Sequence, residues 1–498
     1  MNPGLRLLPA ILMGCACLAA CGTTETPQKW GDVPGGRFIA DHEGRALILH
    51  GMNVMSANKS GPSHLPTASF DQARVISQKW GFNAVRFLIL WSGLEPQPGQ
   101  YNETYFEGIR AWLDFWHTQQ VYVILDMHQD VYAAKFCCDG APDWAIRDDG
   151  LPFELHDAWF LNYFEPAVQR SFDNFWDHEG PHADLQQHYQ ALWQEVARRF
   201  KDHPALLGYD IINEPHPGSY FDPLEAIGME NPDSRSPEFD LTRLGPFYQR
   251  TIDAIRTVDQ DNWVFFEPRY GAPGNGFPSW IEKLHDGRPG QPRIAYFPHL
   301  YSIKLENDQA YDPENDPCLA NWEQARRADV ARQNAPLALG EWGLSPDWPN
   351  ALLFMEQVCQ LADRMLAGWT YWSFDPGGWA ITQSDYTERP SADILVRPYP
   401  RAVAGVPTLI AFDTDSKEFQ LEFQDNDQSR GATELHLPRR HYPDGFTIEI
   451  DGESAPATTF QWDQERDLVR LTVAKSGGSH RVVVRPVTSP AARRPPWP

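Results

Sequence analysis

Eight apolar, β-rich runs recur along the chain, and amphipathic segments separate most of them. The runs cover residues 46–52, 83–89, 121–127, 206–213, 263–267, 293–299, 337–341 and 368–373. Their hydrophobicity is continuous rather than alternating, which indicates strands that are buried on both faces of a parallel sheet. Apolar residues recur at helical spacing in the intervening segments 105–119, 185–200, 245–258 and 351–366. Eight strand–helix repeats predict an α/β protein with a (β/α)8 barrel.

The texture of the sequence changes near residue 397. Short runs of alternating apolar and polar residues follow at 408–412, 419–423, 434–437, 446–450, 468–473 and 481–484. This pattern is typical of a small antiparallel β-sandwich. We therefore expect a barrel domain over 37–392, a β-sandwich over 393–488 and a Pro-rich disordered tail over 489–498. We interpret the sandwich as an accessory domain, with a sugar-binding module as the alternative.

The amino terminus has the features of a targeting segment. Arg6 precedes an apolar stretch at 7–20 that is too short to span a bilayer as a mature helix. The segment LAACG at 18–22 resembles a bacterial lipobox. We therefore expect a lipoprotein signal peptide over 1–20, lipidation of Cys21 and a polar linker over 21–36, with an ordinary cleaved signal as the alternative. The protein is then exported, to the outer membrane or cell surface if it is lipidated and otherwise as a secreted protein.

The chain of 498 residues is long enough for two or more domains, and it carries a formal net charge of −25. Such an excess of negative charge argues against binding to nucleic acid or to an anionic membrane surface through Coulomb attraction.

Four cysteines lie beyond the amino-terminal segment, and export makes them candidates for disulfides. A bond between the adjacent Cys137 and Cys138 would be strained, so the sequence favours pairing of these residues with Cys318 or Cys359. The connectivity itself stays open at this point. No Cys/His spacing matches a zinc site, and we expect no metal.

Glu214 and Glu341 lie where two of the apolar runs open into loops. A carboxylate at the end of a buried strand loses hydration, and partners or function must offset that cost. Two such carboxylates at the carboxyl ends of parallel strands can face each other across a pocket, which is the arrangement that retaining glycoside hydrolysis requires. The structural alternative is that each glutamate only bonds backbone at the barrel rim.

The loop after the third run, 128–182, is unusually long, and long loops of this kind tend to be functional. It is rich in aromatic residues: Phe136, Trp144, Phe153, Trp159, Phe160, Tyr163, Phe164, Phe172, Phe175 and Trp176. At the rim of a barrel these side chains could form an apolar channel. The alternative is a packed subdomain that only stiffens the rim.

Polar residues at or just beyond the predicted strand ends form a recognisable set. It consists of Arg86 in VRF, His128 in DMHQD, Asn213 and Glu214 in NEP, His299 and Tyr301 in PHLY, Glu341 in GEWG, and Trp372 in YWS. The tripeptide NEP alone is a weak signal, but the full set, in this order around the barrel, resembles glycoside hydrolase family 5.

More narrowly, the chain resembles the endoglycoceramidase branch of that family. The matching segments are DMHQDVY at 126–132, DGAPDW at 139–144, Asn53 with ANKS at 57–60, FDNFW at 172–176 and RPYPR at 397–401. The resemblance covers residues 37–487, including the two-domain layout. The adjacent Cys137 and Cys138 depart from the family's pattern, which leaves the shape of the third loop and the headgroup preference open.

The resemblance implies two different roles for the glutamates. Glu214 would be the acid/base, with a pKa raised by burial and by the second carboxylate. Glu341 would be the nucleophile, kept ionised by Arg86 and by a hydrogen bond from Tyr301. Asn213, beside the acid, would bond the 2-hydroxyl of the sugar.

The resemblance also implies residues that bind or orient the substrate. Besides Arg86, Asn213 and Tyr301 they are Lys59, His128, Asp130, Trp176, His299 and Trp372. Lys59 and Asp130 would hold hydroxyls of the cleaved sugar, Trp372 would form the floor of its subsite, and Trp176 a wall. The two histidines would orient the acid and the substrate. The structural alternatives are a surface charge for Lys59, a loop cap for Asp130, a core position for Trp176, a satisfied histidine for His128 and a barrel-interior ion pair for Arg86. Glu267, at the end of the fifth run, is a further candidate polar contact.

The resemblance implies an exported, retaining endo-β-glycosidase that hydrolyses the bond between the oligosaccharide and the ceramide of glycosphingolipids. No cofactor is expected, because two carboxylates and water complete the reaction. We expect a monomer whose partners are the glycosphingolipid and, through the amino-terminal lipid anchor, a membrane. The alternatives are another family 5 β-glycosidase (a glucosylceramidase, a diglycosidase or an endoglucanase) and a non-catalytic surface lipoprotein that binds glycans or glycolipids.

Overall fold

Eight parallel strands form the sheet at the centre of the larger domain, in the order β8-β7-β6-β5-β4-β3-β10-β9. A parallel bridge between Tyr296 and Leu337 closes this sheet into a barrel. The computed structural model describes residue 1 and residues 29–226, 229 and 231–487. The barrel strands are β3 (His50–Val54), β4 (Ala84–Leu90), β5 (Tyr122–His128), β6 (Leu206–Asp210), β7 (Trp263–Phe266), β8 (Ile294–Tyr296), β9 (Ala338–Leu339) and β10 (Gly368–Tyr371). The predicted (β/α)8 fold is confirmed.

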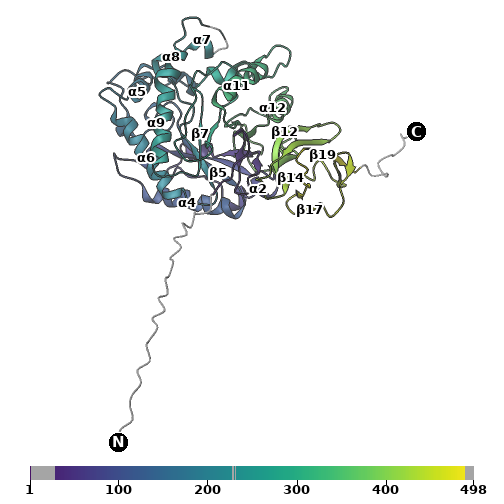
Figure 1. Ribbon diagram of the computed structural model, residues 1–498. Coiled ribbons are helices and arrows are strands. Elements are labelled where there is room, and N and C mark those ends of the chain that lie inside the picture. Colours follow the sequence, from purple (N-terminus) through teal and green to yellow (C-terminus); the bar gives the residue numbers. More distant parts are fainter. Residues whose placement is uncertain (2–28, 227–228, 230, 488–498) are drawn as a thin grey trace, which may run out of the picture.

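Helices surround the barrel on its outer side (Figure 1). The long helices are α4 (Glu103–Thr118), α5 (Pro166–Trp176), α6 (Asp184–Phe200), α9 (Gly245–Arg256), α11 (Cys318–Gln333) and α12 (Ala351–Met365). The short helices are α1 (Phe70–Ala73), α2 (Val75–Gln78), α3 (Trp91–Leu94), α7 (Pro223–Ala226), α8 (Ser236–Phe239), α10 (Ile303–Asp308) and α13 (Ala392–Leu395). The sequence pattern missed α11 because its buried face is not purely apolar: Arg326 and Asp329 form a buried ion pair there, at 2.9 Å.

The first predicted run, 46–52, is divided between the two domains, so this part of the prediction is wrong. Its first half forms β2 (Ala46–Leu47), which pairs with β1 (Ile39–Ala40) and with β11 (Tyr399–Val403) in the smaller domain. The barrel strand β3 begins only at His50. Both sheets bury this segment, so its hydrophobicity gives no signal for the point where the chain passes from one sheet to the other.

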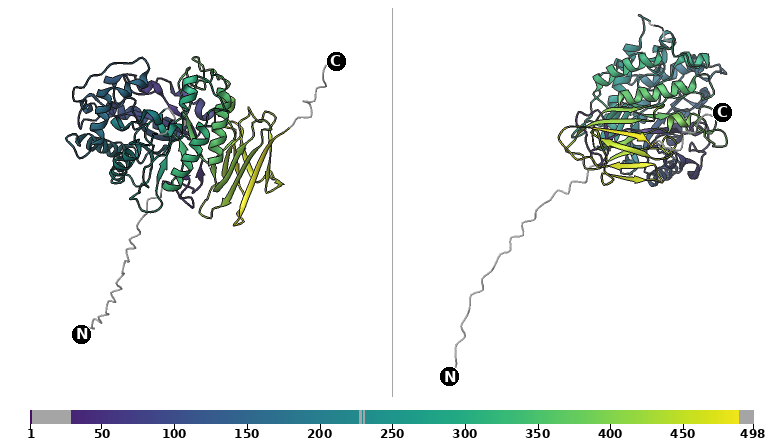
Figure 2. Two further views of the ribbon diagram at one scale, coloured as in Figure 1. Left: turned by 90° about the horizontal axis from the view of Figure 1, so that it is seen from above. Right: turned by 90° about the vertical axis from the view of Figure 1, so that its right-hand side faces the viewer.

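Two antiparallel sheets make up the smaller domain, which lies against one side of the barrel (Figure 2). Their orders are β1-β2-β11-β14-β18-β17 and β12-β13-β19-β15-β16. The strands not yet given are β12 (Gly405–Phe412), β13 (Phe419–Asp425), β14 (Thr433–His436), β15 (Phe446–Ile450), β16 (Glu453–Ser454), β17 (Phe460–Asp463), β18 (Leu468–Leu471) and β19 (Ser479–Pro486). Leu421 and Val484 from one sheet and Leu435 and Val469 from the other meet in a buried cluster, which confirms the β-sandwich.

The sandwich packs at the amino ends of barrel strands. His50, the first residue of β3, is stacked between Trp369 of the barrel and Tyr399 of the sandwich, with ring centroids 4.4 and 3.8 Å away. The Tyr399 hydroxyl also donates a hydrogen bond to the Gly81 carbonyl at 2.9 Å, just before β4. The opposite end of the barrel, where loops follow the strands, is therefore left for a site.

Several expectations fall on parts of the chain that are not described. The signal peptide beyond residue 1, Cys21, most of the linker and the tail at 489–498 lie outside the described residues. Among the residues that are described, we find no helix with the length and apolar character needed to cross a membrane.

Candidate active site

Glu214 and Glu341 lie together at the carboxyl end of the barrel. Glu214 follows β6, Glu341 follows β9, and both line a cavity of about 1070 Å³. One oxygen of each carboxylate and one ring nitrogen of His299 lie within 4.8 Å of one another. Retaining glycosidases place their carboxyl groups about 5–5.5 Å apart, whereas inverting enzymes need roughly 6.5–9.5 Å. The observed spacing fits the retaining arrangement.

Two donors act on the Glu341 carboxylate. Arg86 Nη1 donates to Oε1 at 2.5 Å, and the Tyr301 hydroxyl donates to Oε2 at 3.0 Å. Each hydrogen bond thus places a donor, one of them a cation, on a different oxygen of the carboxylate. This is the electrostatic environment that a carboxylate nucleophile needs.

Glu214 has the opposite environment. Burial raises its pKa and the nearby charge of Glu341 raises it further, while a hydrogen bond from His299 acts in the other direction without cancelling them. The contact joins His299 Nδ1 to Glu214 Oε1 at 2.8 Å. A raised pKa keeps the proton on the acid at higher pH, as a proton donor requires.

Arg86 is the cation beneath the two glutamates. It is completely buried and does not line the cavity, so the expectation that it binds substrate directly is wrong. Its guanidinium contacts acceptors from five neighbouring side chains besides Glu341: Asp210 at 2.8 Å, Asp126, Asn213 and Glu267 at 2.9 Å, and Asn53 at 3.0 Å. One guanidinium can contact this many groups because its five N–H donors point in fixed, divergent directions; the Asp126 contact is an ion pair without a hydrogen bond.

Part of the cavity is a polar slot, which is defined by Lys59, His128, Asp130 and Trp372. Lys59 Nζ donates to Asp130 Oδ2 at 2.5 Å and lies 4.4 Å from the Trp372 ring centroid. His128 is parallel to the Trp372 ring at 5.7 Å and is fixed by Asp126 at 2.7 Å. The structure therefore brings these four predicted residues together around one aromatic face.

Asn213, His299 and Tyr301 also line the cavity, as the sequence predicts. The Asn213 side chain is held on both sides, because its Oδ1 accepts from Arg86 at 2.9 Å and its Nδ2 donates to the Gln129 carbonyl at 3.1 Å. A side chain held in this way presents its amide to the cavity in a fixed orientation.

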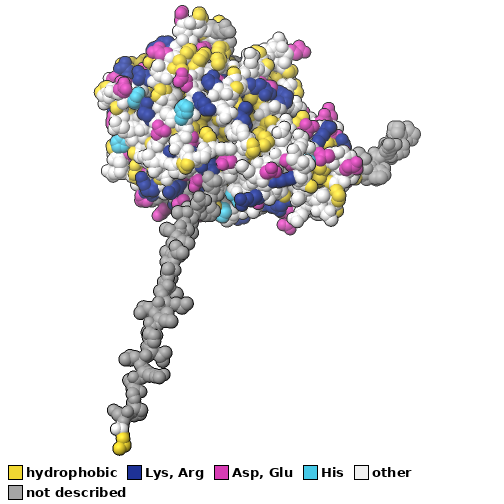
Figure 3. Space-filling model, viewed as in Figure 1, with side chains coloured by type: hydrophobic (Ala, Val, Ile, Leu, Met, Phe, Trp, Pro, Cys, Tyr) yellow, Lys and Arg dark blue, Asp and Glu magenta, His cyan; other side chains and the backbone are white. Residues whose placement is uncertain are grey.

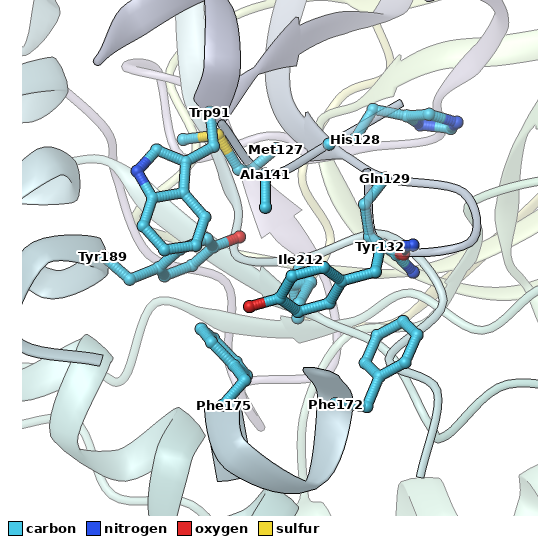
Figure 4. Close-up of a pocket in the computed structure, with 11 residues that line it drawn as sticks. Trp91, Met127, His128, Gln129, Tyr132, Ala141, Phe172, Phe175, Tyr189 and Ile212 are labelled. Atoms are coloured by element: carbon cyan, nitrogen blue, oxygen red, sulfur yellow. Dashed lines mark hydrogen bonds between the residues drawn. The ribbon is translucent and has the colours of Figure 1, made fainter. Parts of the chain in front are cut away.

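Trp176 does not occupy the expected wall position. It is only 2% exposed and its indole donates to the His216 carbonyl at 2.9 Å, in the core behind the cavity. Figure 4 shows its neighbours Phe172 and Phe175, which α5 presents to an apolar pocket together with Trp91 and Tyr189. The part of the third loop that forms α5 is therefore a packed subdomain. His128 points away from it in the same view.

The segment Trp159–Phe164 of the third loop presents exposed aromatic side chains to the cavity. Its side chains Trp159, Phe160 and Phe164 are 45%, 43% and 44% exposed. Phe221 and Leu224, from the loop after β6, line the same part of the cavity. Figure 3 shows hydrophobic side chains gathered near the top of this view, around the projection that carries α7. The cavity therefore joins a polar slot to an apolar rim, in agreement with the channel interpretation.

The disulfide prediction is wrong. Cys137 and Cys138 bond to each other, while Cys318 and Cys359 are buried free thiols. Cys318 begins α11 and Cys359 lies within α12, in the helical layer around the barrel. The third loop instead lies over the cavity, which the Cys137 and Cys138 side chains line. Sequence position alone could not show that these two regions are kept apart.

Glu267 contacts both the cation beneath the glutamates and the backbone of Glu214, which is a larger role than the polar contact that the sequence indicated. It is 1% exposed, accepts from Arg86, and accepts from the Glu214 backbone N–H at 2.8 Å. No role for Asp126 or Asp210 was predicted from the sequence, although both are acidic residues inside apolar runs, which is the available signal. These three acids hold Arg86 and through it Glu341.

Comparison with known proteins agrees with this geometry. Residues 41–378 match the family model for cellulase (glycosyl hydrolase family 5), and residues 397–484 match the glycoside hydrolase family 5 C-terminal domain. An endoglycoceramidase from Hydra vulgaris is 28% identical over 454 residues, covering 84% of this chain and 82% of that protein.

Two similar solved structures are of endo-glycoceramidase II from Rhodococcus sp. The complex with ganglioside GM3 is 35% identical, has a TM-score of 0.82, and covers 91% of this chain and 99% of that one. The lactosyl-enzyme intermediate is 36% identical, has a TM-score of 0.80, and covers 91% of this chain and 100% of that one.

Proposed function

Because this chain belongs to glycoside hydrolase family 5, we propose that it is a retaining endo-β-glycosidase that hydrolyses the bond between the oligosaccharide and the ceramide of glycosphingolipids. The observation that carries this proposal is that one cavity is lined by Glu214 and Glu341, by the polar slot and by the apolar rim. A glycan and a lipid tail on either side of one scissile bond match these two surfaces.

Each glutamate performs one half of the reaction. Glu341 attacks the anomeric carbon while Glu214 donates its proton to the departing ceramide oxygen, which gives a glycosyl ester on Glu341 and free ceramide. Glu214 then removes a proton from water, which attacks the ester and releases the glycan with its original configuration. Two carboxylates and water complete the chemistry.

The surrounding residues hold the substrate and the acid. Trp372 forms the floor of the sugar site, and Lys59 and Asp130 bind hydroxyls there. Asn213 bonds the 2-hydroxyl, a contact that strengthens in the transition state. Arg86 and Tyr301 stabilise the charge of Glu341, while His128 orients the sugar from beside Trp372. The exposed aromatic residues of the third loop contact the ceramide.

Product analysis with a panel of glycosphingolipids tests the proposal. We expect intact oligosaccharide and free ceramide in equal amounts, identified by mass spectrometry. Release of monosaccharide alone would point to an exo-acting glucosylceramidase. Cleavage of soluble β-glucan without cleavage of glycolipid would point to an endoglucanase, and binding without cleavage to a non-catalytic receptor.

Replacing His299 should move the alkaline limb of the pH profile of kcat/KM to higher pH. The hydrogen bond and the charge of His299 both lower the pKa of Glu214, so their removal in His299→Ala raises it. Because Glu214 must be protonated to act, activity is lost as pH rises through its pKa, and the alkaline limb of kcat/KM moves to higher pH. An alkaline limb that stays in place or moves to lower pH in His299→Ala contradicts this role. The control is His178→Ala, which lies outside the cavity and should leave the alkaline limb unchanged.

We also propose, from the sequence alone, that the protein acts as a monomeric exported lipoprotein anchored through Cys21. Radiolabelled palmitate should be incorporated into the wild-type chain in a bacterial host and not into Cys21→Ser. Incorporation into both proteins, or into neither, contradicts acylation at this position.

A further inference from the structure

The turn that carries the adjacent disulfide lies directly beside the polar slot. Cys137, Cys138 and Asp139 all line the cavity. The backbone of Asp139 pairs with that of Asp130 in an antiparallel bridge, through N–H···O contacts of 3.2 and 3.3 Å. Directly paired residues of antiparallel segments place their side chains on one face, so the Asp139 carboxyl lies next to the acid that holds Lys59.

Asp139 is a buried acid with an unused oxygen. The residue is 3% exposed, and its Oδ1 has no hydrogen-bond partner among the described residues. Burial and then the charge of Asp130 raise the pKa of Asp139 to about 7, against the attraction of Lys59. An unpaired buried polar atom is costly, and one at the wall of a ligand cavity indicates a partner that arrives with the ligand.

A metal ion is a poorer partner than a sugar hydroxyl. One ligand atom each from His128, Asp130 and Asp139 lies within 4.8 Å of the others, which is a spacing that a cation could use. The cation is already present, however, because Lys59 Nζ contacts Asp130 at 2.5 Å. A neutral hydroxyl satisfies the free Asp139 oxygen without adding a second positive charge.

The disulfide links this turn to the apolar rim. Cys137 adopts a left-handed backbone with φ of 105°, and its Sγ accepts a hydrogen bond from Asn162 Nδ2 at 3.4 Å. Asn162 is fully buried and also donates to the Trp159 carbonyl at 3.0 Å, at the start of the exposed aromatic segment. The turn therefore connects the sugar side and the lipid side of the cavity.

We infer that Asp139 binds a hydroxyl of the glycan, and that the Cys137–Cys138 disulfide is the positioning element that holds Asp139 against Asp130. The inference rests on the proposed function, since it assigns a further sugar contact to the same site. A dithiol that reaches the disulfide through the cavity transfers two electrons and two protons to it. The Cys137–Cys138 disulfide becomes two thiols, and the dithiol becomes a cyclic disulfide. The turn that carries Asp139 is then no longer held by the bond.

Calorimetric titration of the full chain with lactose tests the sugar contact. We expect Asp139→Ala to weaken binding about tenfold and Asp139→Asn less, because the amide keeps an oxygen acceptor. With an aryl β-lactoside the loss should appear in KM, with kcat nearly unchanged. Unchanged binding in a folded Asp139→Ala variant overturns the assignment of this residue.

Reduction tests the positioning role. We expect dithiothreitol to weaken lactose binding of the wild type toward that of Asp139→Ala, and Cys137→Ser/Cys138→Ser to bind as weakly without responding to the reductant. The double variant retains Cys318 and Cys359 and so controls for those thiols. Full binding by wild type whose disulfide is shown by mass to be reduced overturns the role of the bond.

These results are separable from the fate of the proposed function. Wild type that binds lactose but leaves glycosphingolipids intact refutes the proposed reaction, while the Asp139 comparison still decides the sugar contact. Wild type that binds no lactose overturns the inference directly, whereas ceramide release from glycolipids would still support the reaction.

Discussion

Glu341→Gln lowers the kcat for glycolipid hydrolysis by about 10⁴-fold or more, because an amide cannot form the glycosyl ester. The fold should survive, since the amide has the shape of the acid and Arg86 keeps Asp210 at 2.8 Å and Glu267 at 2.9 Å. The measurement is ceramide release together with the melting temperature. Loss of activity with loss of folding would leave the nucleophile unassigned, so Glu341→Asp, which retains the charge, is measured beside it.

Glu214→Gln separates the two roles. The departing ceramide oxygen needs a proton, so its release should fall by about 10²–10⁴-fold. An aryl β-lactoside with a weakly basic leaving group needs no such proton, and formation of the glycosyl ester from it should be far less affected. Equal losses for the two substrates contradict the assignment of Glu214 as the acid.

Glu306→Gln is the matched control for both variants. Glu306 lies on α10 and lines the same cavity, and burial raises its pKa to about 7, with a further contribution from the charge of Glu214. It has neither the Arg86 contact of Glu341 nor the His299 contact of Glu214. We expect its kcat to stay within about threefold of wild type, a change of less than 1 kcal/mol in the barrier.

Replacement of Arg86 has the largest expected effect on stability. Arg86→Leu leaves Asp126, Asp210, Glu267 and Glu341 buried without their shared cation, and removal of one partner from a buried ion pair costs about 3–5 kcal/mol. Arg86→Lys should recover only part of the loss, because an ammonium cannot reach acceptors in several fixed directions. The free energy of unfolding is measured with urea.

An exposed arginine provides the comparison for this effect. Arg235 pairs with Glu238 at 3.0 Å on the surface, where ion pairs contribute little, and Arg235→Leu should change the unfolding midpoint only slightly. Similar small changes for both arginines would show that the buried cluster does not depend on its cation. Both Arg86 variants should also lose activity, because Glu341 loses its strongest donor.

Most of the barrel could be predicted from the sequence because both faces of its strands are buried and the runs are continuous. The same property hid the start of β3. The segment 46–52 is apolar throughout, and nothing within it marks the change from the sandwich sheet to the barrel. Helix α11 was missed for a related reason, since its buried Arg326 and Asp329 break the apolar stripe that predicts a helix.

Site residues that directly follow a barrel strand could be placed from the sequence. Glu214 and Glu341 follow strands of one barrel, so topology alone brings them to the same end. Trp176 and Cys137 lie in the long third loop, where burial and pairing depend on how the loop folds back. The predicted surroundings of Trp176 and the favoured partner of Cys137 are therefore wrong.

The most direct test of the central claim is to trap the glycosyl-enzyme and identify the labelled residue. A 2-deoxy-2-fluoro β-lactoside with a good leaving group should inactivate the protein and add one 2-deoxy-2-fluorolactosyl unit. Peptide mass spectrometry should place that unit on Glu341. Labelling of Glu214 instead, or turnover of glycolipid to the inverted anomer, would contradict retaining hydrolysis through Glu341.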